Sequence, residues 1–148
     1  MRYLIRPLKE QDIPAIIEGE TKAFGRSLGF DLIYSDLHLN PYAHYLVLEI
    51  NKKVNGYIGL WITPDGADVI NFYVDKEYQG RGFGKKLLKF AIDLCTMSKV
   101  KQISLEVREN NEVAIALYEK MGFKFSHKRE RYYSDNTDAL VMIKELDV

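Results

Sequence analysis

The sequence predicts a single α/β domain over residues 1–148, and two observations carry this prediction. Apolar runs with strand propensity alternate with helical patterns, and residues 68–108 follow the order strand, glycine-rich turn, helix, strand that is typical of a βαβ unit. A chain of 148 residues can also bury roughly two-thirds of the surface that its unfolded form exposes. We therefore expect it to fold without stabilising cross-links such as disulfide bonds.

The first half of the chain predicts three strands and two helices. Apolar residues with strand propensity dominate three runs, over 3–7, 44–50 and 55–62. Asp12 and Pro14 open one helical stretch, and a second helix is expected over 26–39. Polar residues separate the second strand from the third, which favours a hairpin.

The second half begins with a turn signal at Thr63–Gly66 and continues with the βαβ unit. The strand over 68–75 is apolar on both faces, as expected of a central strand. A helix follows to about Ser98, and the strand over 101–108 alternates apolar and polar residues. The two strands should be parallel, which places the glycine turn and the Glu106 end at the same edge of the sheet.

A capped helix and two strands complete the chain. Asn110 and Asn111 can cap this helix, and Gly122 stops it as a residue with positive φ. The closing strands are expected near 123–133 and 138–146.

Composition argues against several kinds of partner. Lys plus Arg and Asp plus Glu number 21 each, so the overall field favours neither direct nucleic-acid binding nor a membrane surface. No run approaches the ~20 apolar residues of a membrane span. The single Cys95 lies on an apolar helical stripe, which indicates a core thiol in a reducing, cytoplasmic compartment. His38, His44 and His127 are isolated, so no metal site is expected.

The glycine turn predicts an anion site. Gly80, Gly82 and Gly84 precede a helix that lacks Ser, Thr, Asp or Asn at its start, so up to four backbone N–H groups have no side-chain acceptor. A phosphate would satisfy them, and water is the alternative. Positive charge beside the turn comes from Arg81, Lys85 and Lys86. The spacing fits neither a P-loop nor a dinucleotide fingerprint.

Three motifs carry a family resemblance. Gln79–Gly84 resembles the Gln/Arg-x-x-Gly-x-Gly/Ala signature of the GNAT superfamily of acyl-CoA-dependent N-acyltransferases. Residues 104–123 and 129–146 resemble its bacterial ribosomal-protein-alanine N-acetyltransferases and related N-terminal acetyltransferases. The resemblance implies a three-layer fold in which a mixed, mostly antiparallel sheet splays between its two parallel strands, with helices on both faces.

The resemblance also implies that acetyl-CoA is the cosubstrate and that no metal takes part. The backbone of Gly80 to Lys85 would cradle the CoA diphosphate, and the backbone of 72–74 would pair with the pantetheine arm. The residues expected to bind the cosubstrate are Phe72, Tyr73, Val74, Gln79, Gly80, Arg81, Gly82, Phe83, Gly84, Lys85 and Asn111.

Two residues match the catalytic positions of the family. Glu106 matches its general base, acting directly or through water, and Tyr118 matches its general acid near the CoA sulfur. On residue type alone, Glu106 could be a surface strand residue. Tyr118 could equally be a core aromatic, because it shares a helical stripe with Ala114 and Leu117.

The expected acceptor is a protein or peptide N-terminus, by resemblance the N-terminal alanine of a small-subunit ribosomal protein. An α-amine with a pKa of ~7.7–8 is easier to deprotonate than lysine at ~10.4. Tyr132 and Tyr133 match tyrosines of the peptide site, although ordinary strand aromatics are the alternative. The segment Ala23–Leu28 lacks the tryptophan that this subgroup usually carries, which leaves a lysine or polyamine acceptor open. A non-catalytic acyl-CoA sensor is the remaining alternative.

Overall fold

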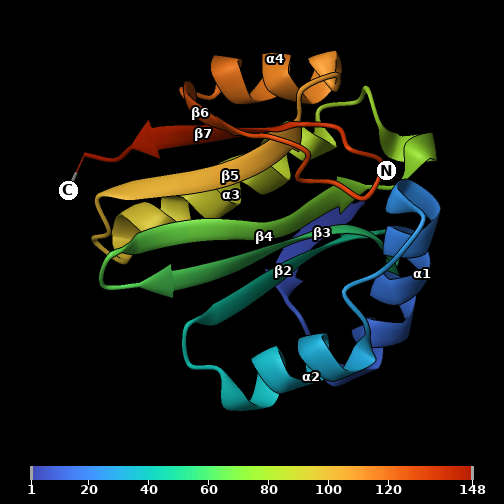
Figure 1. The fold of residues 1–148 in the computed structure, drawn as a ribbon. Helices are drawn as coiled ribbons and strands as arrows, with labels where there is room; N and C mark the ends of the chain where they lie inside the picture. The colour runs from blue at the N-terminus through green and yellow to red at the C-terminus, as the bar shows by residue number, and fades with distance from the viewer. Residues whose placement is uncertain (1, 148) are drawn as a thin grey trace.

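A seven-stranded sheet between two layers of helices forms the fold in the computed structural model, which describes residues 2–147 (Figure 1). The strands are β1 Tyr3–Pro7, β2 Ala43–Ile50, β3 Lys53–Thr63, β4 Gly66–Val74, β5 Gln102–Arg108, β6 Lys124–Arg129 and β7 Ala139–Glu145. The helices are α1 Ile13–Phe24, α2 Phe30–Leu39, α3 Phe83–Met97 and α4 Glu112–Lys120, with 3-10 turns at Glu10–Asp12 and Lys76–Tyr78. No helix in the described range is long and apolar enough to cross a membrane.

The sheet is mixed, as predicted, with the strand order β1-β2-β3-β4-β5-β7-β6. Every neighbouring pair is antiparallel except β4 and β5, the two strands of the βαβ unit. These parallel strands are in register at only two positions, Ala67 opposite Ile103 and Asp68 opposite Ser104. Beyond those positions β4 and β5 separate, which confirms the splayed sheet.

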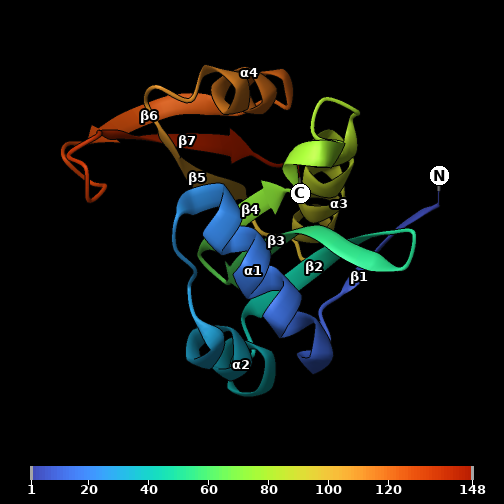
Figure 2. The ribbon, with the colours of Figure 1, turned by 90° about the vertical axis from the view of Figure 1, so that its right-hand side faces the viewer.

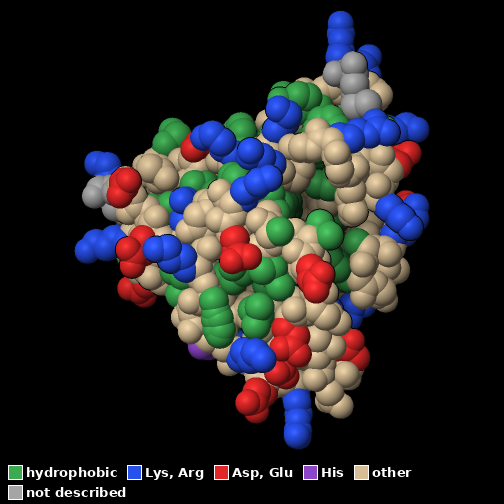
Figure 3. Space-filling view, turned by 90° about the horizontal axis from the view of Figure 1, so that it is seen from above, with side chains coloured by type: hydrophobic (Ala, Val, Ile, Leu, Met, Phe, Trp, Pro, Cys, Tyr) green, Lys and Arg blue, Asp and Glu red, His purple; other side chains and the backbone are tan. Residues whose placement is uncertain are grey.

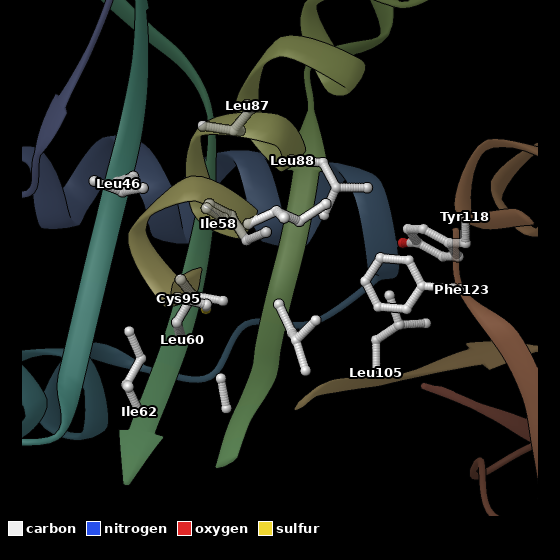
Figure 4. Close-up of a cluster of buried hydrophobic side chains, with 14 of the residues drawn as sticks. Leu46, Ile58, Leu60, Ile62, Leu87, Leu88, Cys95, Leu105, Tyr118 and Phe123 are labelled. Atoms are coloured by element: carbon white, nitrogen blue, oxygen red, sulfur yellow. The ribbon is translucent and has the colours of Figure 1, made fainter. Parts of the chain in front are cut away.

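The two faces of the sheet carry separate cores. On one face, α3 and α4 pack over a cluster that includes Leu87, Cys95 and Phe123 (Figure 4). On the other face, α1 and α2 place Ile16 and Ile33 against strand tyrosines. Figure 2 shows these helix pairs on opposite sides of the sheet. The thiol of Cys95 is fully buried, and burial raises its pKa to about 12, which confirms the predicted core thiol.

Two element boundaries differ from the sequence prediction by more than two residues. The second helix begins at Phe30 rather than at 26, because Ser27 and Leu28 bond instead to a carboxylate of α1. Strand β6 ends at Arg129 rather than near 133. Tyr132 and Tyr133 therefore lie in the β6–β7 loop, and the strand-aromatic alternative is wrong.

A buried carboxylate on α1 ties these elements together. The Glu20 side chain has no solvent exposure and accepts hydrogen bonds from the Ser27 hydroxyl at 2.6 Å and the Leu28 N–H at 3.2 Å. It also accepts from the Tyr57 hydroxyl on β3 and the Asn71 amide on β4. Burial, and then the Glu20 charge, raise the pKa of Tyr57, so this phenol stays protonated as a donor. A buried charge is tolerated because every neighbour is a donor.

We expect Glu20→Ala to lower the free energy of unfolding by about 3 kcal/mol, because it leaves several buried donors without an acceptor. Glu18→Ala is the matched control, since Glu18 lies on the same helix with an exposed side chain, and it should change stability by less than about 0.5 kcal/mol. Urea unfolding followed by circular dichroism measures both. Equal midpoints for the two variants would show that the network contributes nothing.

Candidate active site

The separation of β4 from β5 creates a notch at the carboxyl ends of both strands. The glycine turn directly follows β4, and Glu106 lies near the end of β5, so the structure confirms that they share one edge. On its other side β4 is paired with β3 as far as Val74. The edge of β4 that faces the notch at 69–74 is therefore open to a ligand. Parallel sheets bind ligands at this position.

The glycine turn presents free backbone donors, as predicted. Gly80 and Gly82 have φ values of 77° and 85°, and α3 starts after Gly82 without a side-chain cap. A Cβ at either glycine would meet no heavy atom within 4 Å, so the turn is open. The Gln79 amide donates to the Val74 carbonyl at 2.8 Å and ties the turn to the end of β4. These features fit a phosphate group.

Basic side chains beside the turn rest on aromatic rings. The Arg81 guanidinium lies 5.5 Å from the Tyr78 ring centre, and the Lys86 ammonium lies 5.7 Å from that of Tyr3. Across the face seen in Figure 3, basic and acidic side chains are interspersed, with apolar side chains between them. Positive charge is thus supplied locally, at the turn.

Three of the other predicted cosubstrate residues, Phe72, Tyr73 and Asn111, occupy different environments. Tyr73 is buried on the α1 face, whereas Phe72 is half-buried and its ring centre lies 6.4 Å from that of Tyr118. The Asn111 side chain accepts from the Ala114 N–H at 3.2 Å, which confirms the predicted helix cap. The side-chain oxygen of Asn111 therefore already accepts a hydrogen bond from the first turn of α4.

Tyr118 combines a buried ring with an available hydroxyl. The residue is 8% exposed and packs between Phe72 and Phe123. Its hydroxyl makes no hydrogen bond within the described residues, and no buried side-chain polar atom there lacks a partner, so this oxygen keeps some contact with solvent. Figure 4 shows it pointing away from α4 toward the strands. Burial raises the pKa of Tyr118 to about 12.

Glu106 lies on the opposite face of the sheet. Its neighbour Leu105 belongs to the core shared with Tyr118, so strand alternation turns Glu106 toward the α1 and α2 side. Its side chain is 32% exposed and lines a cavity of about 400 Å³. Other lining residues include Trp61, Asp68, Ile70, Ser104, Arg129 and Tyr132. The notch is thus flanked by Tyr118 on one face and by Glu106 on the other.

The β6–β7 loop brings Tyr132 to this cavity and places Tyr133 against Arg108 on β5. The Arg108 guanidinium donates to both oxygens of Asp135 at 2.9 and 3.0 Å, and it lies 4.1 Å from the Tyr133 ring centre. A hydrogen-bonding contact with Glu106 raises the pKa of Tyr132. Burial, and then the Glu106 charge, raise the pKa of Tyr133. The loop is therefore anchored to β5 beside Glu106.

Sequence reasoning missed several members of this site. Trp61, Asp68 and Arg129 reach the cavity from three different strands, and no local pattern relates them. Trp61 is the one tryptophan of the sequence, and its rarity was the one feature that could have indicated a member of this site. Within residues 2–147 no group of three His, Cys, Asp or Glu could hold a metal ion, and His38 pairs with Glu10 at 2.9 Å.

Comparison with known proteins gives consistent matches. The model of the acetyltransferase (GNAT) family matches residues 11–123. A Bacillus subtilis (strain 168) protein, provisionally named a [ribosomal protein bS18]-alanine N-acetyltransferase, is 39% identical over 93% of this chain and 92% of its own. The Escherichia coli K12 protein named [ribosomal protein bS18]-alanine N-acetyltransferase is 32% identical over 93% and 94%. The crystal structure of the Escherichia coli ribosomal-protein-S18-alanine N-acetyltransferase has a TM-score of 0.91 at 30% identity, covering 99% of this chain and 96% of that one.

We predict that Gly82→Ala costs about 1–2 kcal/mol of stability, because an alanine must adopt the left-handed conformation there. Gly84→Ala serves as its control: its Cβ would meet Phe72 at an ordinary 3.8 Å, and alanine favours a helix. Thermal unfolding should show a lower midpoint for the first variant and an unchanged or higher one for the second. The strain argument would be refuted by equal losses in both.

Proposed function

This chain belongs to the acetyltransferase (GNAT) family, and from that premise we propose that it acetylates a protein N-terminus, the N-terminal alanine of ribosomal protein bS18. Relatives at least 32% identical over more than nine-tenths of both chains carry that substrate in their names. The observation that carries the proposal is the notch, with the Glu106 carboxylate on one face and the Tyr118 phenol on the other. Such a reaction belongs in the cytoplasm, where ribosomal proteins are made and assembled.

Acetyl-CoA would be held along the notch edge of β4 and the start of α3. When bound, it supplies an acetyl group activated as a thioester. The amides of Phe83 to Lys85 would donate to its diphosphate, each charge-assisted bond contributing roughly 1.5–3 kcal/mol. The backbone of β4 at Phe72 to Val74 would hold the pantetheine arm as an added strand. This direction of entry leads the thioester toward the Tyr118 hydroxyl.

Glu106 is suited to accept the proton of the incoming amine. An α-ammonium group has a pKa of ~7.7–8, so a carboxylate can assist its deprotonation directly or through one water. The Arg129 guanidinium lies 3.9 Å from the Glu106 carboxylate and offsets part of its charge. A lysine acceptor at ~10.4 would cost roughly 3 kcal/mol more to deprotonate. An N-terminus is therefore the better substrate for this site.

Tyr118 is suited to donate a hydrogen bond to the sulfur that departs. Its pKa of about 12 keeps the phenol protonated throughout the neutral range. Full proton transfer to a thiolate whose thiol has a pKa of ~8.5 is uphill, so the hydrogen bond itself carries the stabilisation. Water can then protonate the released thiolate. Because burial raises its pKa, Tyr118 is better suited to donate a hydrogen bond to the sulfur than to transfer a proton to it.

The direct test is a thiol-release assay. Purified protein is given acetyl-CoA and the N-terminal peptide of bS18, then the same peptide with a blocked N-terminus and an internal lysine, and then spermidine. We expect free CoA only with the unblocked peptide. Release with either of the other amines would reassign the acceptor. Tight CoA binding without release from any amine would identify a sensor.

Glu106→Gln should lower kcat/KM for the bS18 peptide most at pH 6–7, by about 100-fold, because few α-amines are neutral there. Above about pH 9 the amine is already neutral, so the loss should shrink. The Kd for CoA should not change. Glu119→Gln, on the exposed side of α4, is the control. A loss that is equal at every pH would remove Glu106 from the base role.

Tyr118→Phe should slow acetyl transfer in a single turnover by roughly 100-fold, because one donor to developing charge is lost. Its thermal midpoint should stay near wild type, since the hydroxyl makes no hydrogen bond within the described residues. With a pKa of about 12, Tyr118 should add no alkaline limb to the wild-type profile between pH 6 and 10. Tyr42→Phe, at an exposed position, is the control. An unchanged transfer rate would exclude the donor role.

A further inference from the structure

The cavity beside Glu106 has a second carboxylate in its lining, on an exposed residue. Asp68 on β4 lines the same cavity, and its oxygen accepts a hydrogen bond from the Ser104 hydroxyl at 2.6 Å. Within residues 2–147, no Lys, Arg or His lies within 4.0 Å of Asp68. The one basic residue of the lining, Arg129, lies at the Glu106 end. The Asp68 end of the cavity is therefore left with an uncompensated negative charge.

Aromatic side chains border this charge. Trp61 stands opposite Asp68 in the pairing of β3 with β4, and Tyr132 lines the cavity from the β6–β7 loop. The Trp61 indole N–H donates to Asp36 of α2 at 2.9 Å, which fixes the ring at the cavity wall. A carboxylate next to a fixed indole suits a cation, and a guanidinium best, because it pairs with the acid and stacks on the ring.

The register sets the spacing between Asp68 and Glu106. Asp68 pairs with Ser104, which precedes Glu106 by two residues on the same face of β5. That step along a strand is roughly 7 Å. A peptide whose α-amine lies at Glu106 has its second residue about 4 Å further along, and a long side chain from there spans the remaining distance.

We propose that Asp68 is a specificity-determining residue that selects acceptors with a basic side chain, arginine above all, at the second position. This inference rests on the proposed N-terminal acetylation. Asp68 does not contact the reacting atoms, so it acts on acceptor binding and not on the acetyl transfer itself. Its pairing with the acceptor is electrostatic and weakens as salt rises.

The test uses four peptides that differ only at the second residue: Arg, Lys, Gln and Glu. For the wild-type chain we expect kcat/KM to be about tenfold higher with Arg than with Gln, through KM, and the ratio to fall with ionic strength. Asp68→Asn should bring the ratio near one, through a loss with the Arg peptide, and leave the Kd for CoA unchanged. Asp68→Lys should favour the Glu peptide. Asp65→Asn, at an exposed turn before β4, is the control and should keep the wild-type ratio.

The outcomes separate this inference from the function on which it rests. If the wild-type chain releases thiol but the Arg to Gln ratio is the same in Asp68→Asn, Asp68 has no role in selection. If no peptide is acetylated by the wild-type chain, the proposed function falls and this inference falls with it. Thermal midpoints of all variants establish that they are folded.

Discussion

The parting of β4 from β5 is the constraint on which the rest of the molecule depends. β5 is paired with β7 along its full length, and β4 is paired with β3 as far as Val74. Beyond Asp68 and Ser104, where β4 and β5 stop pairing with each other, each strand therefore has one paired edge and one free edge. Free backbone groups need a partner, which water or a ligand must supply. The opening thus exposes an edge of β4, places the glycine turn beside it and has two side chains of different chemistry, Glu106 and Tyr118, on opposite faces.

Such an opening needs rigid walls, and polar contacts supply them, buried at Glu20 and exposed at Arg108. Glu20 fixes the segment between α1 and α2 against β3 and β4. On the other side of the notch, the Arg108–Asp135 pair anchors the β6–β7 loop to the end of β5. Directional hydrogen bonds suit this task better than apolar packing, because they fix the position of a loop as well as its burial.

Charge is organised locally in a chain with no net charge. Cations gather where the cosubstrate phosphates would lie, and carboxylates gather in the cavity on the other face, where an amine would enter. The Arg129 guanidinium offsets part of the Glu106 charge, whereas the Asp68 carboxylate is paired only with the Ser104 hydroxyl. Under the proposed function, the two substrates would therefore meet electrostatic fields of opposite sign, although the molecule as a whole is neutral.

The sequence by itself determined the features that depend on neighbours in the chain: the βαβ unit, the uncapped start of α3, the Asn111 cap and the hairpin of β2 and β3. Each follows from hydrogen-bonding needs or side-chain periodicity within a few residues. Only the tertiary structure decided that β7 lies between β5 and β6, that Glu20 binds Asn71 across 51 positions of sequence, and that Asp68 shares a cavity with Glu106. Those contacts join residues that are distant in the chain, and strand pairing across the whole sheet sets them.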